Sequence, residues 1–156
     1  MKSSIIIGIV LIISFFIAPG AFSQSATGVE SPVGNVVKPG KTITGKASWY
    51  GPGLQGRETA SGKRFDQNQS TAASNRLPLG TKAKVTNLRN GRSVKVRIND
   101  CGPNVDGRKI DLSRKAARHL AMTHEGVAPV KIKVEHVPPG AQSCAQIRHN
   151  TVQSRH

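Results

Sequence analysis

The chain has 156 residues, of which 23 are basic and 8 are acidic, so its formal net charge at pH 7 is +15. A surplus of this size indicates attraction to polyanions rather than a particular fold. Nucleic acid is a poor match, because side chains for base stacking are few (one Trp, one Tyr and four Phe) and the chain begins like an exported protein. We therefore expect anionic polymers of a cell envelope as partners, and no nucleic acid.

Residues 1–23 have the pattern of a cleaved secretory signal peptide. Lys2 precedes an uncharged run over residues 5–17, IIIGIVLIISFFI, and the small residues Ala21 and Ser23 follow it. A membrane anchor is the alternative, but this run is short for a bilayer span. We expect export to the periplasm or the cell exterior, no stable membrane anchor after cleavage, and a mature net charge of +14, since only Lys2 among the charged residues is lost.

The rest of the chain suits one domain, since about 130 residues can bury one modest core. Residues 24–41 are rich in Ser, Gly, Val and Pro without periodicity, which predicts a linker. A barrel domain is predicted over residues 42–137. Residues 138–156 form a polar, basic tail that we expect to be ordered at most around Cys144.

Three segments alternate between apolar and polar residues, as strands with one buried face do. ITGKASWYG (43–51) predicts a first strand that ends at Trp49 and Tyr50. Residues 81–100 predict a hairpin around Asn90-Gly91, a dipeptide that suits a tight turn with positive φ at both central residues. In this hairpin and in the third segment, residues 129–137, the side chains expected inside are Val94, Val96, Ile98, Val130, Ile132 and Val134.

Between these segments, IDLSRKAARHLAM (110–122) predicts a short helix capped by Ser113. The residues expected to pack on the sheet are Ala116, Ala117, Leu120 and Ala121. Many short strands, glycine-rich turns and one or two short helices describe a mainly β protein with a compact barrel.

The two cysteines, Cys101 and Cys144, predict one disulfide, because an exported chain meets an oxidising compartment. Two free, buried thiols are the alternative. The five histidines show no metal-ligand spacing, so no metal and no cofactor are expected.

Four segments together resemble the rare lipoprotein A family of bacterial envelope proteins. They are GKASWYG (45–51), TASGKRFD (59–66), TAASNRLPLGTKAKVTNLRNGRSVKVRINDCGP (71–103) and KIDLSRKAA (109–117). The resemblance implies a six-stranded double-psi β-barrel that acts as a lytic transglycosylase on peptidoglycan glycan strands. More distantly, the segments resemble barwin, the expansins and family-45 endoglucanases, all of which handle polysaccharides.

The implied reaction can operate with a single carboxyl group. The C6 hydroxyl of MurNAc attacks its own C1 and leaves a 1,6-anhydro sugar, so one group can serve first as acid and then as base. A glycoside hydrolase typically needs two carboxylates. Asp100 matches the aspartate of the family motif R-I-N-D, to which catalysis is attributed, and is the principal candidate.

Two further acids are candidates for an assisting catalytic role. Asp111 lies in KIDLS and matches the acidic residue of the expansin and family-45 motif D-L-S, although an Asp before a helix can instead bond backbone amides. Glu58, five residues before Lys63, can reach the same cleft across a loop. The other acids of the mature chain have the pattern of turn, linker or surface residues: Glu30, Asp66, Asp106, Glu125 and Glu135.

The chain departs from the family pattern at two positions to which catalysis is also attributed. The family reads TASGE where this chain has Lys63, and TAAH where it has Ser74. Neither replacement can act as a carboxylic acid or an imidazole. Both suit a groove for an anionic glycan, in which aromatic faces stack on sugar rings and cations attract carboxylates. The predicted substrate-binding residues are Trp49, Tyr50, Lys63, Ser74 and Arg76, with Arg57 and Arg64 nearby.

Trp49 has a second interpretation, as a residue that packs the end of the barrel. The function also has two interpretations. The resemblance and Asp100 favour a lytic transglycosylase, whereas Lys63 and Ser74 favour a non-catalytic, expansin-like module that binds or loosens the wall. A barwin-like secreted defence protein is a third possibility, suggested by the cysteine beside Asp100. The sequence names no protein partner.

Overall fold

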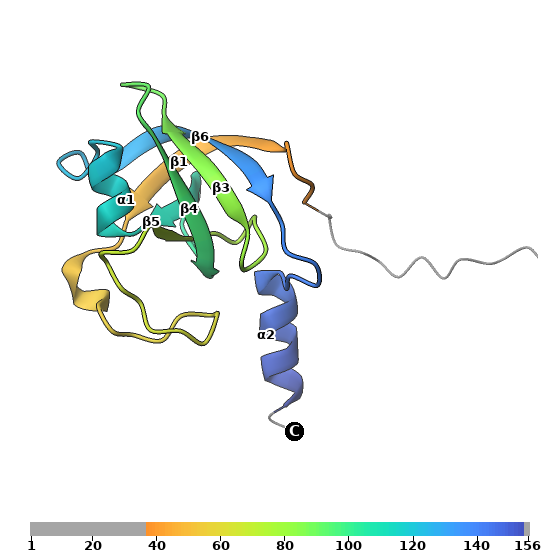
Figure 1. Ribbon diagram of the computed structural model, residues 1–156. Coiled ribbons are helices and arrows are strands. Elements are labelled where there is room, and N and C mark those ends of the chain that lie inside the picture. The colour runs from red at the N-terminus through yellow and green to blue at the C-terminus, as the bar shows by residue number, and fades with distance from the viewer. Residues whose placement is uncertain (1–36, 155–156) are drawn as a thin grey trace, which may run out of the picture. The chain divides into compact units, whose positions relative to one another are not determined.

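The computed structural model of the chain describes residues 37–154 (Figure 1). The predicted signal peptide lies outside these residues, and so does the predicted linker up to residue 36. No helix within residues 37–154 has the length and apolar character needed to cross a bilayer. The elements in chain order are β1 (Thr42–Trp49), the 3-10 helix η1 (Pro52–Leu54), β2 (Thr71–Ala73), β3 (Lys82–Asn87), β4 (Ser93–Asp100), β5 (Arg108–Leu112), α1 (Arg114–His119), β6 (Val127–His136) and α2 (Cys144–Gln153).

The six strands close into a barrel in the order β1-β5-β2-β4-β3-β6, with β6 paired again to β1. Two neighbouring pairs are parallel, β1 with β5 and β2 with β4, and the others are antiparallel. Closure leaves no strand with an unpaired edge. The predicted fold class, a mainly β, six-stranded barrel with one or two short helices, is confirmed.

Four of the six strands, β1, β3, β4 and β6, come from the alternating segments that the sequence indicated, whereas β2 and β5 were not predicted. Val85 pairs with Ile132 and Ala83 with Val134 across β3 and β6, and all four side chains are at most 1% exposed. Lys84 pairs with Lys133 between them on the outer face. Each fully buried Val or Ile stabilises the fold by about 1.5–3 kcal/mol relative to exposure. Of the predicted interior positions in these strands, Val94 alone is half-buried, and it packs at the margin of the core.

The β3–β4 hairpin forms, but its turn differs from the tight turn predicted at Asn90-Gly91. Gly91 has positive φ, at 73°, whereas Asn90 does not. The loop runs over residues 88–92 and is closed by the Asn87 amide, which donates to Arg92 O at 2.8 Å. Asn90 instead donates its side-chain amide to Leu120 O at 3.0 Å, so a contact with the end of α1 shapes the turn.

Helix α1 begins as predicted and packs against β1, β4 and β5. The Ser113 hydroxyl accepts from the Ala116 amide at 3.3 Å, which confirms the cap. The prediction for Ala121 was wrong. The helix ends at His119, Ala121 adopts a positive φ of 50° and is exposed, and Met122 is buried in its place.

The tail is more ordered than the sequence indicated. Helix α2 extends from Cys144 to Gln153 beside the end of the barrel where β4 ends (Figure 1). Ser143 and Gln146 form a capping box at its start, a pair of bonds that satisfies two backbone amides. The predicted Cys101–Cys144 disulfide is present and fastens this start to the loop after β4.

We expect the double substitution Cys101→Ser with Cys144→Ser to lower the free energy of unfolding by about 4 kcal/mol, because the bond closes a loop with a sequence separation of 43 residues. Urea titration of the oxidised protein and the double variant measures this difference. Reduced wild type should match the variant. Equal midpoints for oxidised protein and variant would contradict the prediction.

Candidate functional site

The short strand β2 brings the two candidate aspartates together. Ala73 pairs with Asp100 of β4 on one side and with Asp111 of β5 on the other. Tyr50 joins the same end of the barrel, since its amide donates to Leu112 O at 2.9 Å. Four segments, the ends of β2, β4 and β5 and the residue after β1, thus meet at one barrel end.

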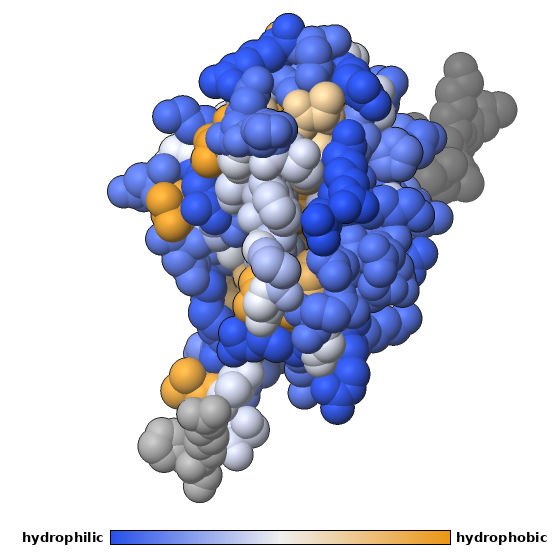
Figure 2. Space-filling model, turned by 90° about the vertical axis from the view of Figure 1, so that its left-hand side faces the viewer, coloured by the Kyte–Doolittle hydropathy of each residue, from blue (hydrophilic) through white to orange (hydrophobic). Residues whose placement is uncertain are grey.

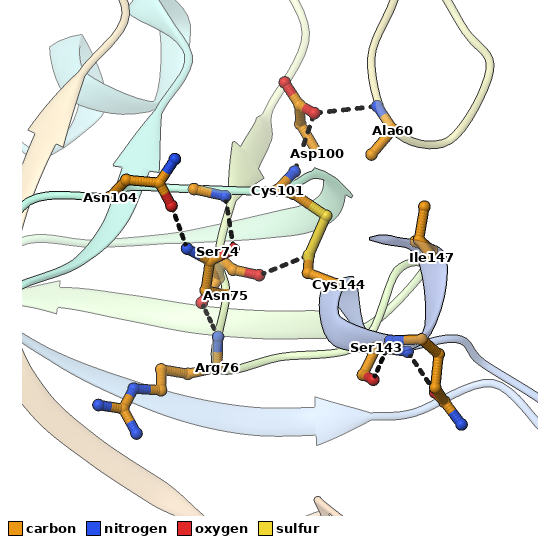
Figure 3. The surroundings of a disulfide bond; sticks show 12 residues. Ala60, Ser74, Asn75, Arg76, Asp100, Cys101, Asn104, Ser143, Cys144 and Ile147 are labelled. Atoms are coloured by element: carbon orange, nitrogen blue, oxygen red, sulfur yellow. Dashed lines mark hydrogen bonds between the residues drawn. A yellow bond between two sulfur atoms is a disulfide. The ribbon is translucent and has the colours of Figure 1, made fainter. Parts of the chain in front are cut away.

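The carboxylate of Asp100 is held in a fixed orientation. Its Oδ1 accepts from the Ala60 amide at 2.9 Å and from the Cys101 amide at 2.8 Å (Figure 3). Both backbone donors reach the same oxygen, so Oδ2 carries neither bond. The turn that supplies Ala60 is attached a second time, because the Ser61 amide donates to Asn99 O at 3.1 Å.

Asn75 fastens the loop that follows Asp100, a role that sequence reasoning missed. Its side-chain oxygen accepts from the Gly102 amide at 3.1 Å, and its amide nitrogen donates to Pro103 O and Asn104 Oδ1, both at 3.0 Å. With the disulfide at Cys101, this clamp positions the loop from two sides. The available signal was an amide side chain two residues after β2, inside the third of the four segments that carry the family resemblance.

Asp100 lines a cleft of about 220 Å³. Glu58 lines this same cleft, so the structure brings together the two carboxylates that the sequence proposed to meet across a loop. Glu58 is exposed, and its backbone forms an isolated antiparallel β-bridge with that of Arg64 in the loop between η1 and β2. The full lining comprises Tyr50, Leu54, Arg57, Glu58, Thr59, Phe65 and Asp100.

Tyr50 forms an amphipathic wall of the cleft. Its ring packs edge-on against Phe65, with ring centroids 5.1 Å apart and an interplanar angle of 66°. Burial raises the pKa of the Tyr50 phenol well above its ordinary value of 10, and the nearby negative charges of Asp100 and then Asp111 raise this pKa further. The hydroxyl therefore stays protonated at physiological pH and can donate a hydrogen bond. Phe65 was not among the predicted site residues, and its only signal was an apolar residue inside a polar loop.

Asp111 is engaged within the protein rather than presented to the cleft. It is 7% exposed, and its Oδ1 accepts from the Ser48 hydroxyl of β1. Arg108 Nη2 lies 2.8 Å from both carboxylate oxygens. The partners are those of a buried ion pair, so the geometry suits holding the site together better than exchanging a proton with a substrate.

The two positions that depart from the family pattern are placed very differently. Lys63 is exposed in the turn that carries Ala60, and its carbonyl accepts from the Thr59 amide and hydroxyl, both at 2.8 Å. Ser74 is fully buried, and its hydroxyl donates to Lys109 O at 2.9 Å. The Cys144 sulfur lies 3.5 Å from the Ser74 carbonyl oxygen. Ser74 therefore does not reach the cleft, in contrast to its predicted contact with substrate.

The other predicted binding residues do not form one groove. Arg57 lines the cleft of Asp100, whereas Arg76 lines a separate cavity of about 490 Å³ beside residues 103–109. Arg64 donates from Nη1 to Gly56 O at 2.9 Å. Trp49 is half-buried and packs against the barrel core, which agrees with its second interpretation.

Chemically, the cleft offers one oriented carboxylate, a second carboxylate, a neutral phenol and a guanidinium. A proton can be given and taken at Asp100, the phenol can donate to a hydroxyl or ring oxygen, and Arg57 can attract a substrate carboxylate. The half-buried ring of Tyr50, backed by the buried ring of Phe65, supplies apolar surface for a sugar ring. Within residues 37–154 no group of three His, Cys, Asp or Glu side chains is arranged to hold a metal ion.

Comparison with protein families gives a match over residues 42–132 to the family described as lytic transglycolase. The chain is 59% identical over 90 residues to the probable endolytic peptidoglycan transglycosylase RlpA of Synechocystis, covering 58% of this chain and 28% of the relative. It is 52% identical over 99 residues to the endolytic peptidoglycan transglycosylase RlpA of Campylobacter jejuni, covering 64% and 36%. The chain thus spans only about a third of the length of these relatives.

Among solved structures, the Streptomyces papain inhibitor is similar with a TM-score of 0.53 and 26% identity, covering 65% of this chain and all of that one. An expansin of Clavibacter michiganensis is similar with a TM-score of 0.50 and 24% identity, covering 64% of this chain and 53% of that one. The expansin likeness concerns the fold alone.

Because Tyr50 is the one tyrosine of the chain, its ionisation can be followed directly by absorbance at 295 nm. We expect tyrosinate to form only well above pH 10, and Asp100→Asn to lower this pKa by removing a negative charge. The phenol of the unfolded chain ionises first, so the free energy of unfolding should fall as pH rises above 10.

Tyr50→Phe supplies the blank for this titration, since it removes the signal. A midpoint near pH 10 in the folded wild type, or no shift in Asp100→Asn, would contradict the electrostatic description of the cleft.

Proposed function

The chain belongs to the lytic transglycolase family, and on that basis we propose that it cleaves peptidoglycan glycan strands between MurNAc and GlcNAc, with Asp100 as acid and base. The observation that carries the proposal is the carboxylate of Asp100, oriented by two backbone amides at the mouth of a cleft that also holds Tyr50 and Glu58. Side chains that act on a substrate work best when their surroundings fix them in this way.

In the proposed reaction, Asp100 first gives a proton to the glycosidic oxygen as the bond to C1 of MurNAc breaks. The C6 hydroxyl of the same sugar then attacks C1, and Asp100 takes up the hydroxyl proton. The products are a 1,6-anhydro end and a free GlcNAc hydroxyl, so atoms and protons balance without water. Tyr50, kept neutral by its surroundings, can hold a sugar hydroxyl or steady the carboxylate.

Glu58 is the better of the two assisting candidates. It shares the cleft with Asp100, where a second negative charge can stabilise the positive charge that develops on the sugar ring. Asp111, paired with Arg108 and Ser48, supports the site instead as a positioning residue between β1 and β5.

Arg57 is the proposed contact for the anionic part of the substrate. It is exposed on the cleft wall, where it can pair with the lactyl or peptide carboxylate of MurNAc. Lys63 is exposed on the neighbouring turn and adds positive charge near the cleft. Because the substrate lies in the cell envelope, the proposal includes export to the periplasm or the cell exterior.

A second candidate function is a non-catalytic module that binds or loosens the wall. The replacement of the family Glu by Lys63 and of the family His by Ser74 favours this alternative. The burial of Ser74 agrees with this alternative, since its hydroxyl is bonded to Lys109 O and does not take the place of the family His in the cleft. In this case the same cleft would hold the glycan without breaking it.

We expect wild-type protein to release anhydro-ended products from purified glycan strands, detected by mass spectrometry, and Asp100→Asn to lower their rate of formation by about 10²–10⁴-fold through loss of the acid. Glu58→Gln should lower the rate less. Strands with and without stem peptides should both be used, because Arg57 can pair with the peptide carboxylates in the first case and with the free lactyl carboxylate in the second.

Glu135→Gln is the matched control, since it removes a carboxylate on β6 that pairs with Lys95 outside the cleft. Undiminished activity in Asp100→Asn would assign the acid to another residue. If wild type yields no anhydro product but still pellets with sacculi, the proposal of an enzyme is wrong and the non-catalytic binding function is supported. Lys63→Glu restores the carboxylate that the family has at this position. The variant should release anhydro products faster than wild type if that carboxylate contributes to catalysis.

A further inference from the structure

A second cavity, of about 480 Å³, lies beside α1 and shares no lining residue with the cleft of Asp100. Its lining brings three segments together: residues 66–70, the β3–β4 turn and α1. The lining residues are Asn68, Arg92, Lys115, Arg118 and His119. None of the five is acidic, and three carry a permanent positive charge.

Hydrogen bonds between the segments fix this cavity. The Lys115 amide donates to Gln67 O at 3.0 Å, and the Ser113 hydroxyl donates to Gln69 O at 2.5 Å, which holds residues 66–70 against the start of α1. On the other side, Arg92 Nε donates to His119 O at 2.6 Å. The backbone segments that carry the cationic side chains are therefore held together before a ligand binds.

The carbonyl oxygens that would repel an anion at the end of α1 are already bonded. His119 O accepts from Arg92, and Leu120 O accepts from the side-chain amides of Asn87 and Asn90 at 3.1 and 3.0 Å. The Nε bond of Arg92 also fixes its guanidinium plane. Within residues 37–154 its two Nη groups make no hydrogen bond, so they are available to a ligand.

The positive charges of the cavity are not neutralised by the described part of the chain. The ion pairs within residues 37–154 join Arg89 to Glu125, Lys95 to Glu135 and Arg108 to Asp111. Lys115 and Arg118 lie three residues apart on α1, a spacing at which like charges repel. Asp66, the acid closest in sequence to Asn68, accepts from the Asn68 amide and is not part of the lining.

We propose that this cavity binds a phosphate group of a phosphodiester polymer. Guanidinium groups match the tetrahedral oxyanion with paired donors, the Lys115 ammonium adds a point charge, and the Asn68 amide adds a neutral donor. A volume of about 480 Å³ exceeds one phosphate, so part of the adjoining polyol fits as well. The side of the molecule that carries α1 is mostly hydrophilic, as Figure 2 shows, which favours a polymer over insertion into a membrane.

The proposal is independent of glycan cleavage. It assigns part of the positive charge of the domain to the binding of phosphate. Residues 55–70 contribute Arg57, Glu58, Thr59 and Phe65 to the cleft and Asn68 to the cavity. A polymer held at the cavity would therefore anchor the domain to its surroundings and leave the cleft open.

The test measures binding of a fluorescent glycerol phosphate oligomer by anisotropy at about 0.15 M salt, where general attraction between exposed charges is screened beyond about 8 Å. Lys115→Gln with Arg118→Gln should raise the Kd about tenfold or more, since each removes a charged hydrogen bond. Both side chains are exposed and unpaired in the described chain, so the variant should fold, which circular dichroism checks. Adding Arg92→Gln should weaken binding further.

The matched control is Lys131→Gln with Lys133→Gln, which removes the same charge from the outer face of β6. Its Kd should change less than about threefold. An equal loss in both double variants would overturn the proposal in favour of general attraction. Equal affinity for polyglutamate would overturn the choice of phosphate, and binding to phosphatidylglycerol vesicles but not to the oligomer would assign the cavity to a membrane. Release of anhydro products should be the same in both double variants, which separates this proposal from the proposed enzyme.

Discussion

The three-residue strand β2 is the constraint on which the site depends. It is buried throughout and lies between β4 and β5, so that Ala73 pairs with Asp100 on one side and Asp111 on the other. A slip of one residue would turn neighbouring side chains to opposite faces of the sheet and disturb the positions of Asp100 at the cleft and of Asp111 beside Arg108. Alanine suits this position because it is fully buried between two carboxylate-bearing strands.

From this register, the loop after Asp100 is held by contacts from separate parts of the chain. The Ala60 amide reaches the carboxylate, Asn75 clamps Gly102, and the disulfide connects Cys101 to α2. Each contact removes freedom from a loop that would otherwise be mobile at the end of a strand. The stability of the tail and the orientation of the acid are thereby coupled, because both depend on the same few residues.

The charged side chains are distributed differently at the cleft and at the cavity beside α1. The cleft contains both signs, because Arg57 lines it together with the carboxylates of Glu58 and Asp100, a combination that suits the proposed reaction on an anionic sugar. The cavity beside α1 contains cations and neutral groups alone. Part of the net charge of +15 is therefore gathered at one place, where Arg92, Lys115 and Arg118 line the same cavity.

Local sequence was enough to predict four of the six strands (β1, β3, β4 and β6), the Ser113 cap and the cysteine pair, because alternation and capping act over a few neighbouring residues. The short strands β2 and β5 carry no such signal, and the leading role of Asp100 remains a prediction from the family resemblance. Tertiary structure alone decided that Glu58 joins Asp100, that Ser74 is buried and that Asn75 clamps the loop. The contact of Asn90 with Leu120 O shapes the β3–β4 turn, and the disulfide fastens the start of α2 to the barrel. These features depend on which distant segments meet when the barrel closes, and local patterns carry no record of those contacts.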